Sequence, residues 1–441
     1  MTISYLPYEP NQLRLMPDAL QDWLPEGHLA YFISDAVDQL DLSAFHRRYA
    51  KGGPRNQPFH PAMMVKVLVY GYATGVFSSR KIARRLHEDV AFRMLGAENF
   101  PAHRTICDFR ALHLEELGGL FVQVVKLARE MGLVKLGTVA VDGTKIKANA
   151  SRHKAMSYER MLKAEAELQE QIRALLDKAK AADEAEKSQP EVDLPAEIKS
   201  REDRLKAIAA AKARLEQRQR EADTARGRRE GDERKPRDKD GKPKGGRYKR
   251  EFGIPKEDAQ ESFTDSDSRI MKRAGGGFDQ SYNAQTAVDE HAHIIVAAEV
   301  TNVAADSGQL PVMLAAIQVN LDAQPEQALA DAGYRSEAVF EQLSTSKTEV
   351  IVALGREGKD GVRSDADKCP HTVAMHDKLQ GADGRQAYRK RKWIVEPPNA
   401  WIKAILGFRQ FSMRGLTKVQ AEFKLVCMAL NLRRMGAMRS A

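Results

Sequence analysis

Residues 138–148 read TVAVDGTKIKA, a run whose apolar part ends at Asp142. β-Branched residues in near alternation are typical of a strand, so Asp142 is expected close to the end of one. The short apolar run EQALADAGY at 326–334 places Asp331 in the same way. Glu396 lies in the basic run YRKRKWIVEPPNAWIK at 388–403, which is expected to form a helix. The chain thus offers three carboxylates at the ends of regular elements.

These three carboxylates predict an oxygen-rich site for a divalent metal. Mg²⁺ prefers hard oxygen ligands and completes its octahedron with water and phosphate oxygens, and Mn²⁺ accepts the same kinds of ligand. Two such ions can activate an attacking oxygen and stabilise a leaving oxygen on one phosphorus. We therefore expect Asp142, Asp331 and Glu396 to be both the metal ligands and the catalytic residues of a phosphoryl transfer.

The composition favours a globular protein with a polyanionic partner. The chain has 441 residues, 42% of them hydrophobic, and a formal net charge of +9. This length suggests two to four domains, and the positive charge favours DNA over an acidic protein partner. Much of the charge is local, because residues 226–250 contain twelve Lys or Arg against five Asp or Glu. That tract is polar and rich in Gly and Pro, so we expect it to lack packing, as a solvated linker or a DNA-contacting arm.

Cysteine usage and the lack of a targeting signal predict a soluble protein of a reducing cytoplasm. The three cysteines are far apart, and His371 and His376 near Cys369 make a poor zinc site. The N-terminus lacks a signal pattern, and no apolar run is long enough to cross a membrane. No Gly-rich phosphate loop of the ATPase kind occurs, so no ATP is expected.

Residues 1–135 are predicted to form a helical domain for DNA binding or dimerisation. One helix should run from Pro61 to Gly75, a second should follow Ser78 or Ser79, and a long third should be capped by Thr105. The second helix carries an exposed basic face that we assign to DNA, made of Arg80, Lys81, Arg84 and Arg85. This pattern fits a helix-turn-helix motif and equally a helical bundle with a solvated basic face.

The rest of the chain is predicted to be an α/β domain with an insertion. The domain begins at 136–155, a helical hairpin is inserted at 156–225, a basic low-complexity linker covers 226–260, and the domain resumes at 261–441. After the linker we expect two strands, a helix from about Asn302, a strand, a helix, a strand and further helices. Apart from the insertion, this is close to the element order of a mixed RNase H-like sheet.

Several motifs in a fixed order resemble the bacterial insertion-sequence transposases of the DDE class. They are VDGTKIKANAS, TDSDSRIM, YNAQTAVD, ADAGY and the set Tyr388, Arg391, Glu396 and Lys403. The resemblance implies an RNase H-like catalytic domain whose metal-binding triad is Asp142, Asp331 and Glu396. It also implies that Tyr388, Arg391 and Lys403 lie near the DNA backbone. Two features depart from the common pattern: four residues separate Arg391 from Glu396 instead of three, and PPNAW replaces an aromatic-Gly step.

The resemblance implies a DNA transposase that uses Mg²⁺, with Mn²⁺ as a possible substitute. Such an enzyme binds the terminal inverted repeats of its own element, cuts double-stranded DNA and transfers the freed 3′ ends to a target. Because two ends must meet, we expect a homodimer on DNA. Two alternatives stay open: a catalytically silent DNA-binding protein derived from a transposase, and an RNase H-like nuclease without strand transfer.

Other acidic residues compete with the proposed ligands. Asp289 fits a hairpin turn, and Asp306 fits the N-cap of the helix after it. Asp265 and Asp267 are expected either to form a turn or to contribute to the site. We favour structural roles for all four.

Overall fold

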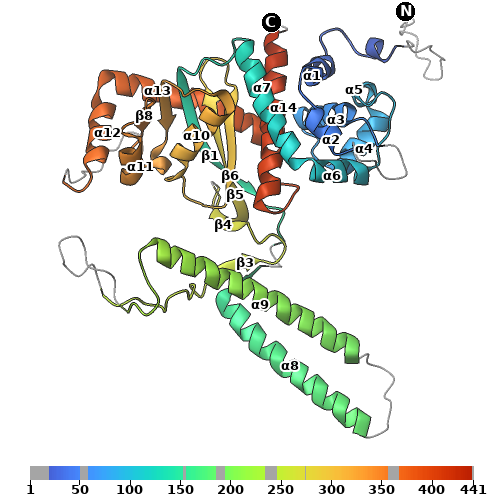
Figure 1. Ribbon diagram of the computed structural model, residues 1–441, viewed down its shortest axis with the longest axis vertical. Coiled ribbons are helices and arrows are strands. Elements are labelled where there is room, and N and C mark those ends of the chain that lie inside the picture. Colours follow the sequence, from blue (N-terminus) through green and yellow to red (C-terminus); the bar gives the residue numbers. More distant parts are fainter. Residues whose placement is uncertain are drawn as a thin grey trace, which may run out of the picture.

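The computed structural model describes residues 19–49, 58–151, 155–184, 194–233, 246–273, 275–355 and 367–439. Its N-terminal region is helical, as expected, and lies at one side of the molecule (Figure 1). The elements are η1 (Leu20–Trp23), α1 (Leu29–Asp38), α2 (Ser43–Arg47), α3 (Pro61–Ala73), α4 (Ser79–Glu88), α5 (Val90–Leu95), α6 (His103–Leu112) and α7 (Leu114–Glu130).

The long helix predicted from Thr105 is in fact two helices, α6 and α7. The first begins at His103 after the N-cap Ala102, so the assignment of Thr105 as a cap is wrong. The break falls at His113, whose ring is fully buried 4.9 Å from the ring of Phe45 and 4.5 Å from that of Phe109. Tertiary packing of this one side chain therefore overrides a continuous helical pattern.

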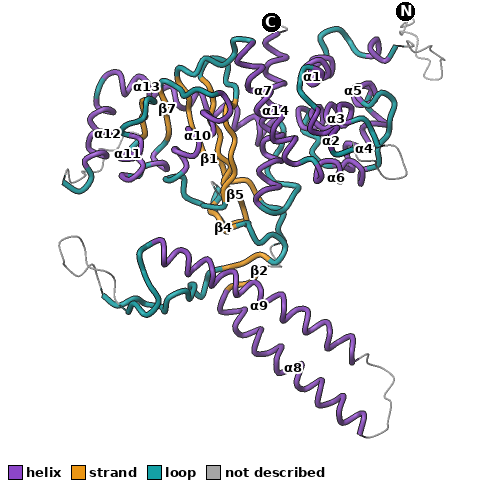
Figure 2. The backbone as a smooth tube through the Cα atoms, in the orientation of Figure 1, coloured by secondary structure: helices purple, strands orange, loops and turns teal. Residues whose placement is uncertain are grey.

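A mixed six-stranded sheet forms the centre of the molecule (Figure 2). Strand β5 (Phe278–Asp289) pairs antiparallel with β1 (Thr138–Lys147), and β1 pairs in parallel with β7 (Gln327–Ala330). Next to β7 lies β8 (Glu349–Val352), also parallel, and β6 (Ile295–Thr301) and the short β4 (Arg269–Lys272) both pair with β5. The mixed sheet expected from the element order is thus confirmed, and β4 is an addition that the sequence did not suggest.

Helices cover this sheet and join it to the N-terminal region. They are α10 (Gln309–Leu321), η3 (Ala332–Tyr334), α11 (Glu337–Leu343), α12 (Pro370–Gln380), α13 (Ala382–Ala400), η4 (Trp401–Ile405) and α14 (Leu416–Arg439). Helix α13 packs against β1, β5, β7 and β8, and α14 packs against β6, α7 and α3. Buried apolar side chains of the helical region and of the sheet consequently belong to one continuous core.

The predicted helical hairpin is present and projects from the body of the molecule (Figure 1). It consists of α8 (Tyr158–Glu184) and α9 (Leu194–Ala225), with a small core of its own. The strands β2 (Ala155–Ser157) and β3 (Gln260–Ser262) pair at its base. There Glu261 is fully buried and forms ion pairs with Arg214 and Arg218 of α9. The hairpin is therefore held at its base by strand pairing and buried ion pairs.

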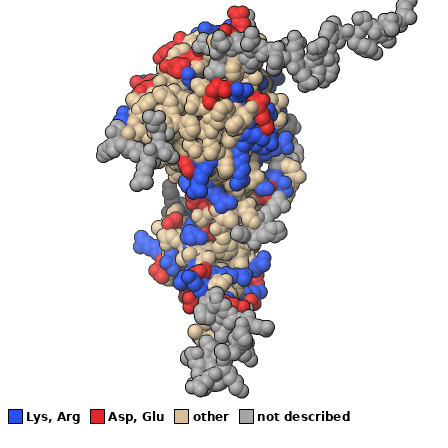
Figure 3. Space-filling view, turned by 90° about the vertical axis from the view of Figure 1, so that its right-hand side faces the viewer, with Lys and Arg blue, Asp and Glu red and all other residues tan. Residues whose placement is uncertain are grey.

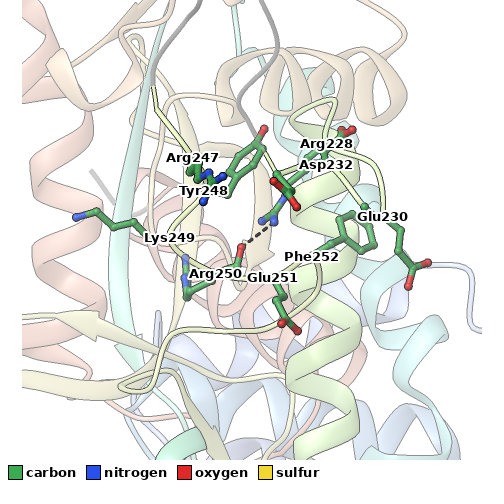
Figure 4. Close-up of a pocket in the computed structure, with 11 residues that line it drawn as sticks. Arg228, Glu230, Asp232, Arg247, Tyr248, Lys249, Arg250, Glu251 and Phe252 are labelled. Carbon is green, nitrogen blue, oxygen red and sulfur yellow. Dashed lines mark hydrogen bonds between the residues drawn. The ribbon is translucent and has the colours of Figure 1, made fainter.

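The segment after the hairpin is partly packed, so the expectation of an unpacked tract is wrong for its described part. The guanidinium of Arg228 is buried 3.8 Å from the centre of the Tyr248 ring and donates to the backbone oxygen of Arg250 (Figure 4). The surrounding pocket, of about 630 Å³, is lined by acidic and basic side chains alike. Residues 234–245 of the tract lie outside the described residues.

Within the described residues, no helix has the length and apolar character needed to cross a bilayer.

Candidate active site

The two aspartates of the predicted triad lie side by side where the parallel pairing of two neighbouring strands ends. In the parallel pairing of β1 with β7, Val141 is opposite Ala330, and each is followed directly by one of the aspartates. β7 ends at Ala330, whereas β1 continues to Lys147 along β5, so the expectation that Asp142 lies close to the end of its strand is wrong. Because each aspartate directly follows the last pair of the parallel ladder, Asp142 and Asp331 are still neighbours.

Electrostatics at this edge favour a cation. Burial, and next to it the Asp331 carboxylate, raise the pKa of Asp142 from 3.8 to about 6. Arg391 and a hydrogen bond from Asn399 act in the opposite direction. A bound divalent cation would offset the repulsion between these two poorly hydrated carboxylates, whose oxygens are ligands that such ions prefer. Asp142 and Asp331 thus fit a metal site by their chemistry.

Glu396 lies on α13, the helix that packs over both strands, but its side chain is exposed. No group of three or more His, Cys, Asp or Glu side chains is close enough to hold a metal within the described ranges. Glu396 lies three residues before Asn399 on this helix, and Lys403 follows in the π-helical turn η4. The structure therefore brings Asp142 and Asp331 together and places Glu396 on the helix that packs over their strands, without completing the cluster.

The side chain on α13 that contacts Asp142 is Asn399. Its amide nitrogen donates to Asp142 Oδ2 at 3.2 Å, and its oxygen accepts from Thr286 Oγ1 at 3.1 Å. Asn399 stands out in the sequence only as part of the unusual PPNAW step, and no role was predicted for it. No local signal in the sequence assigns this contact, because it joins two residues that are 257 positions apart.

The basic residues of the motif lie at different depths. Arg391 is only 8% exposed, and its guanidinium carbon lies 5.9 Å from the centre of the half-buried Tyr388 ring. Burial lowers the pKa of Lys403, while the nearby Asp142 carboxylate raises it. Lys403 and Arg391 are therefore both within electrostatic reach of Asp142. Contact of Tyr388, Arg391 and Lys403 with DNA stays a prediction.

Three of the competing acids have structural roles. Asp289 accepts from the backbone nitrogens of Leu136 and His291, as a turn residue does. Asp265 accepts from the Tyr282 hydroxyl at 2.7 Å and from the backbone of Gly415.

Asp267 accepts from the backbone nitrogen of Leu416 at 2.8 Å. Because Leu416 is the first residue of α14, Asp267 caps that helix from a distant part of the chain. The favoured structural interpretation of Asp265, Asp267 and Asp289 agrees with these contacts.

The assignment of Asp306 as a helix N-cap is wrong. Helix α10 begins at Gln309 with Gly308 as its N-cap, and not near Asn302. The Asp306 carboxylate instead accepts from Asn283 at 2.6 Å and Gln285 at 2.7 Å, two alternate residues of β5. It also forms an ion pair with Lys145 of β1 at 3.1 Å. The two polar residues at alternate positions of YNAQTAVD were the signal that could have indicated this network.

The Asp306 network lies against the aspartate pair. A Cβ atom added to Gly143 would come within 2.5 Å of Asp306 Oδ1, so only glycine fits after Asp142. A Cβ added to Gly333 would lie 3.0 Å from Asp331 Oδ1 and 3.3 Å from Asp306 Oδ2. Asp306 thus holds Lys145 close to the edge where the two aspartates meet.

The predicted basic face on α4 is exposed on the helical region. Arg80, Lys81, Arg84 and Arg85 are all accessible, while Ile82 and Leu86 of the same helix are buried. Arg84 and Arg85 form ion pairs with acidic residues one turn on, at 3.3 and 3.7 Å. On the face of the molecule seen in Figure 3, Lys and Arg side chains gather on the lower part of the body. This exposure fits both the DNA-binding and the solvated-surface interpretation.

Comparison with known protein families gives two matches. Residues 18–112 match the family described as Transposase domain (DUF772), and residues 251–432 match the family described as Transposase DDE domain. The first match covers the helical N-terminal region as far as α6, and the second runs from before β3 into α14, including Asp331 and Glu396 but not β1 with Asp142. No curated protein and no solved structure matches the chain.

Proposed function

Since the chain belongs to the insertion-sequence DDE transposases, we propose that it cuts DNA at the inverted repeats ending its own element and joins these ends to a target. The observation that carries this proposal is the pair of adjacent carboxylates, Asp142 and Asp331, directly after the point where the parallel pairing of β1 with β7 ends. Burial, together with repulsion by Asp331, raises the pKa of Asp142 and supports a cation at that place. The family as a whole acts on DNA with divalent metal ions.

Asp142, Asp331 and Glu396 would hold the metal, which we take to be Mg²⁺ with Mn²⁺ as a substitute. Bound there, divalent ions supply activation of the attacking oxygen and charge stabilisation at the leaving oxygen. Glu396 lies on α13 three residues before Asn399, which contacts Asp142, so a change of its side-chain conformation would be needed to add a third carboxylate.

The remaining residues of the site suit the handling of a phosphodiester. Lys403 lies near the Asp142 carboxylate, and Lys145 is paired with Asp306 and lies near Lys403; both lysines would bind non-bridging phosphate oxygens as point charges. Arg391, buried beside Asp142, would keep the two carboxylates ionised when the site is loaded.

The reaction has two chemically similar steps. In cleavage, the oxygen of water attacks phosphorus, the bond from phosphorus to the 3′ oxygen breaks, and the 3′ oxygen leaves as a hydroxyl. In joining, that hydroxyl attacks a phosphorus of the target strand, loses its proton to solvent, and displaces a 3′ hydroxyl of the target. No covalent bond between protein and DNA is required.

We also propose how the parts of the chain divide this work. Residues 1–135, with Arg80, Lys81, Arg84 and Arg85, would contact DNA or a second protomer. Segments 136–155 and 261–441 would form the catalytic domain, with 156–225 as the inserted hairpin and 226–260 as a linker. Two element ends must meet for transposition, so the active form would be a homodimer or larger assembly on DNA, at the bacterial nucleoid.

A cleavage and strand-transfer assay tests the proposal. Wild type and Glu396→Gln are incubated with DNA that carries the flanking ends of the element, or scrambled ends, in Mg²⁺, Mn²⁺ or EDTA. We expect end-specific cuts and joined products from wild type only, and only with metal. End-specific binding without cleavage in either metal would favour the silent DNA-binding protein, and cleavage of scrambled ends without joining would favour a nuclease.

A further inference from the structure

Asn399 connects helix α13 to the centre of the sheet. It follows Pro397 and Pro398 near the end of the helix, just before the π-helical turn η4. Its side chain is 9% exposed and reaches both strands β1 and β5 through hydrogen bonds to Asp142 and Thr286. Pi-helical turns are frequent at functional sites because they shift the side chains that follow.

The hydrogen-bond polarity of this contact is fixed by its partners. An ionised carboxylate only accepts, so the Asn399 amide nitrogen must point to Asp142. The amide oxygen then faces Thr286, whose hydroxyl donates to it. Thr286 is fully buried and is the direct cross-strand partner of Asp142 in the antiparallel pairing of β1 with β5. Two hydrogen bonds thus link Thr286 of β5, Asn399 of α13 and Asp142 of β1 into one unit.

This unit restricts the Asp142 carboxylate. An ionised carboxylate offers about four lone-pair positions, and Asn399 occupies one of them on Oδ2. The hydrogen bond also opposes rotation of the carboxylate plane, because Asn399 is itself held by Thr286. Partners of this kind, which orient a ligand without touching the metal, are worth about 10- to 100-fold in metal affinity.

We propose that Asn399 is a positioning residue that orients Asp142 for the cation shared with Asp331, and that Thr286 fixes the Asn399 amide. The inference rests on the proposed function, since it assigns Asp142 as a metal ligand. In the PPNAW sequence, which departs from the expected aromatic-Gly step, Asn399 supplies this contact to Asp142.

Titration with Mn²⁺ in the absence of DNA tests this role directly, with binding followed by the electron paramagnetic resonance signal of free Mn²⁺. Four variants are compared with wild type: Asn399→Ala, Thr286→Val, Thr286→Ser and Asn320→Ala. Asn320 is the matched control, a buried asparagine that donates to the backbone oxygen of Val296 and lies on α10. The midpoint of thermal unfolding is recorded for each.

We expect Asn399→Ala to weaken Mn²⁺ binding by 10- to 100-fold. Thr286→Val should weaken it less, and Thr286→Ser should restore most of the affinity because it keeps the hydroxyl. Asn320→Ala should lower the unfolding midpoint while leaving Mn²⁺ affinity unchanged. In cleavage assays, Asn399→Ala should need more metal for half-maximal rate, with unchanged binding to DNA ends in Ca²⁺.

Two results would separate the possible failures. If wild type binds Mn²⁺ through Asp142 but Asn399→Ala binds it equally well and merely unfolds at lower temperature, Asn399 is structural and the inference is overturned. If wild type binds no Mn²⁺, or if Asp142→Asn binds it as well as wild type does, the proposed metal site itself is wrong. The role assigned to Asn399 is then wrong as well.

Discussion

Replacing Asp142 with Asn should stabilise the metal-free protein while abolishing cleavage. The pKa of Asp142 rises from 3.8 to about 6, first because of burial and then because of Asp331. At about 1.4 kcal/mol for each tenfold change in proton affinity, this corresponds to about 3 kcal/mol against the ionised folded state. Asparagine removes the charge and keeps an oxygen that can accept from Asn399. The gain in unfolding free energy at pH 7.5 should therefore be about 2 to 3 kcal/mol.

The pH dependence follows from the sign of the pKa shift. Well below pH 3.8 the carboxyl of Asp142 is protonated in both the folded and the unfolded chain, so it does not lower the free energy of unfolding. As the pH rises from 3.8 to about 6, the unfolded chain loses this proton first, and the folded state is progressively destabilised. The advantage of Asp142→Asn should thus be near zero at pH 4 and complete above pH 6.

Urea unfolding of both proteins in EDTA, at pH 4 and pH 7.5, measures this difference from the shift in midpoint at constant slope. Addition of about 10 mM Mg²⁺, a concentration chosen to fill a weak site, should stabilise wild type and not the variant. A variant that is less stable than wild type at pH 7.5 in EDTA would refute the reasoning that links charge repulsion to the metal site.

Three further substitutions test neighbouring parts of the site. Gly143→Ala should cost about 1 to 3 kcal/mol of unfolding free energy and weaken Mn²⁺ binding, because the new methyl group overlaps Asp306; unchanged Mn²⁺ titration would contradict this. Lys403→Ala should weaken binding to element ends and lower the slope of log affinity against log salt by about one, measured by fluorescence anisotropy; an unchanged slope would exclude a phosphate contact. Asp267→Ala should lose about 1 kcal/mol of unfolding free energy in urea, because α14 loses its cap, and should still cleave DNA ends. Loss of cleavage with full stability would instead show that Asp267 belongs to the active site.

The parts of the site that follow local rules were predictable from sequence. Near-alternation of β-branched residues identified the strand that carries Asp142, and a short apolar run identified the strand before Asp331; parallel pairing of these strands brings the two carboxylates together. The helical hairpin could be predicted because its apolar residues recur at three- and four-residue steps.

Contacts between distant residues were not predictable. Asp306 satisfies an N-cap pattern, yet Asn283 and Gln285 of β5 and Lys145 of β1 bind its carboxylate instead. Asn399 gave no signal beyond an unusual motif, because its partners come from two strands far away in the sequence. In both cases tertiary hydrogen bonds decide the role of a side chain whose local sequence allows several.

Iron-directed cleavage of the polypeptide tests most directly whether the three carboxylates share one metal site. Fe²⁺ is bound in place of Mg²⁺, ascorbate and peroxide generate hydroxyl radicals at the ion, and mass spectrometry locates the breaks in the chain. Breaks near Asp142, Asp331 and Glu396 that are suppressed by excess Mg²⁺ and absent in Asp142→Asn are the expected result. Breaks that avoid all three segments, or that persist unchanged in Asp142→Asn, would contradict the assignment of this edge of the sheet as the catalytic metal site.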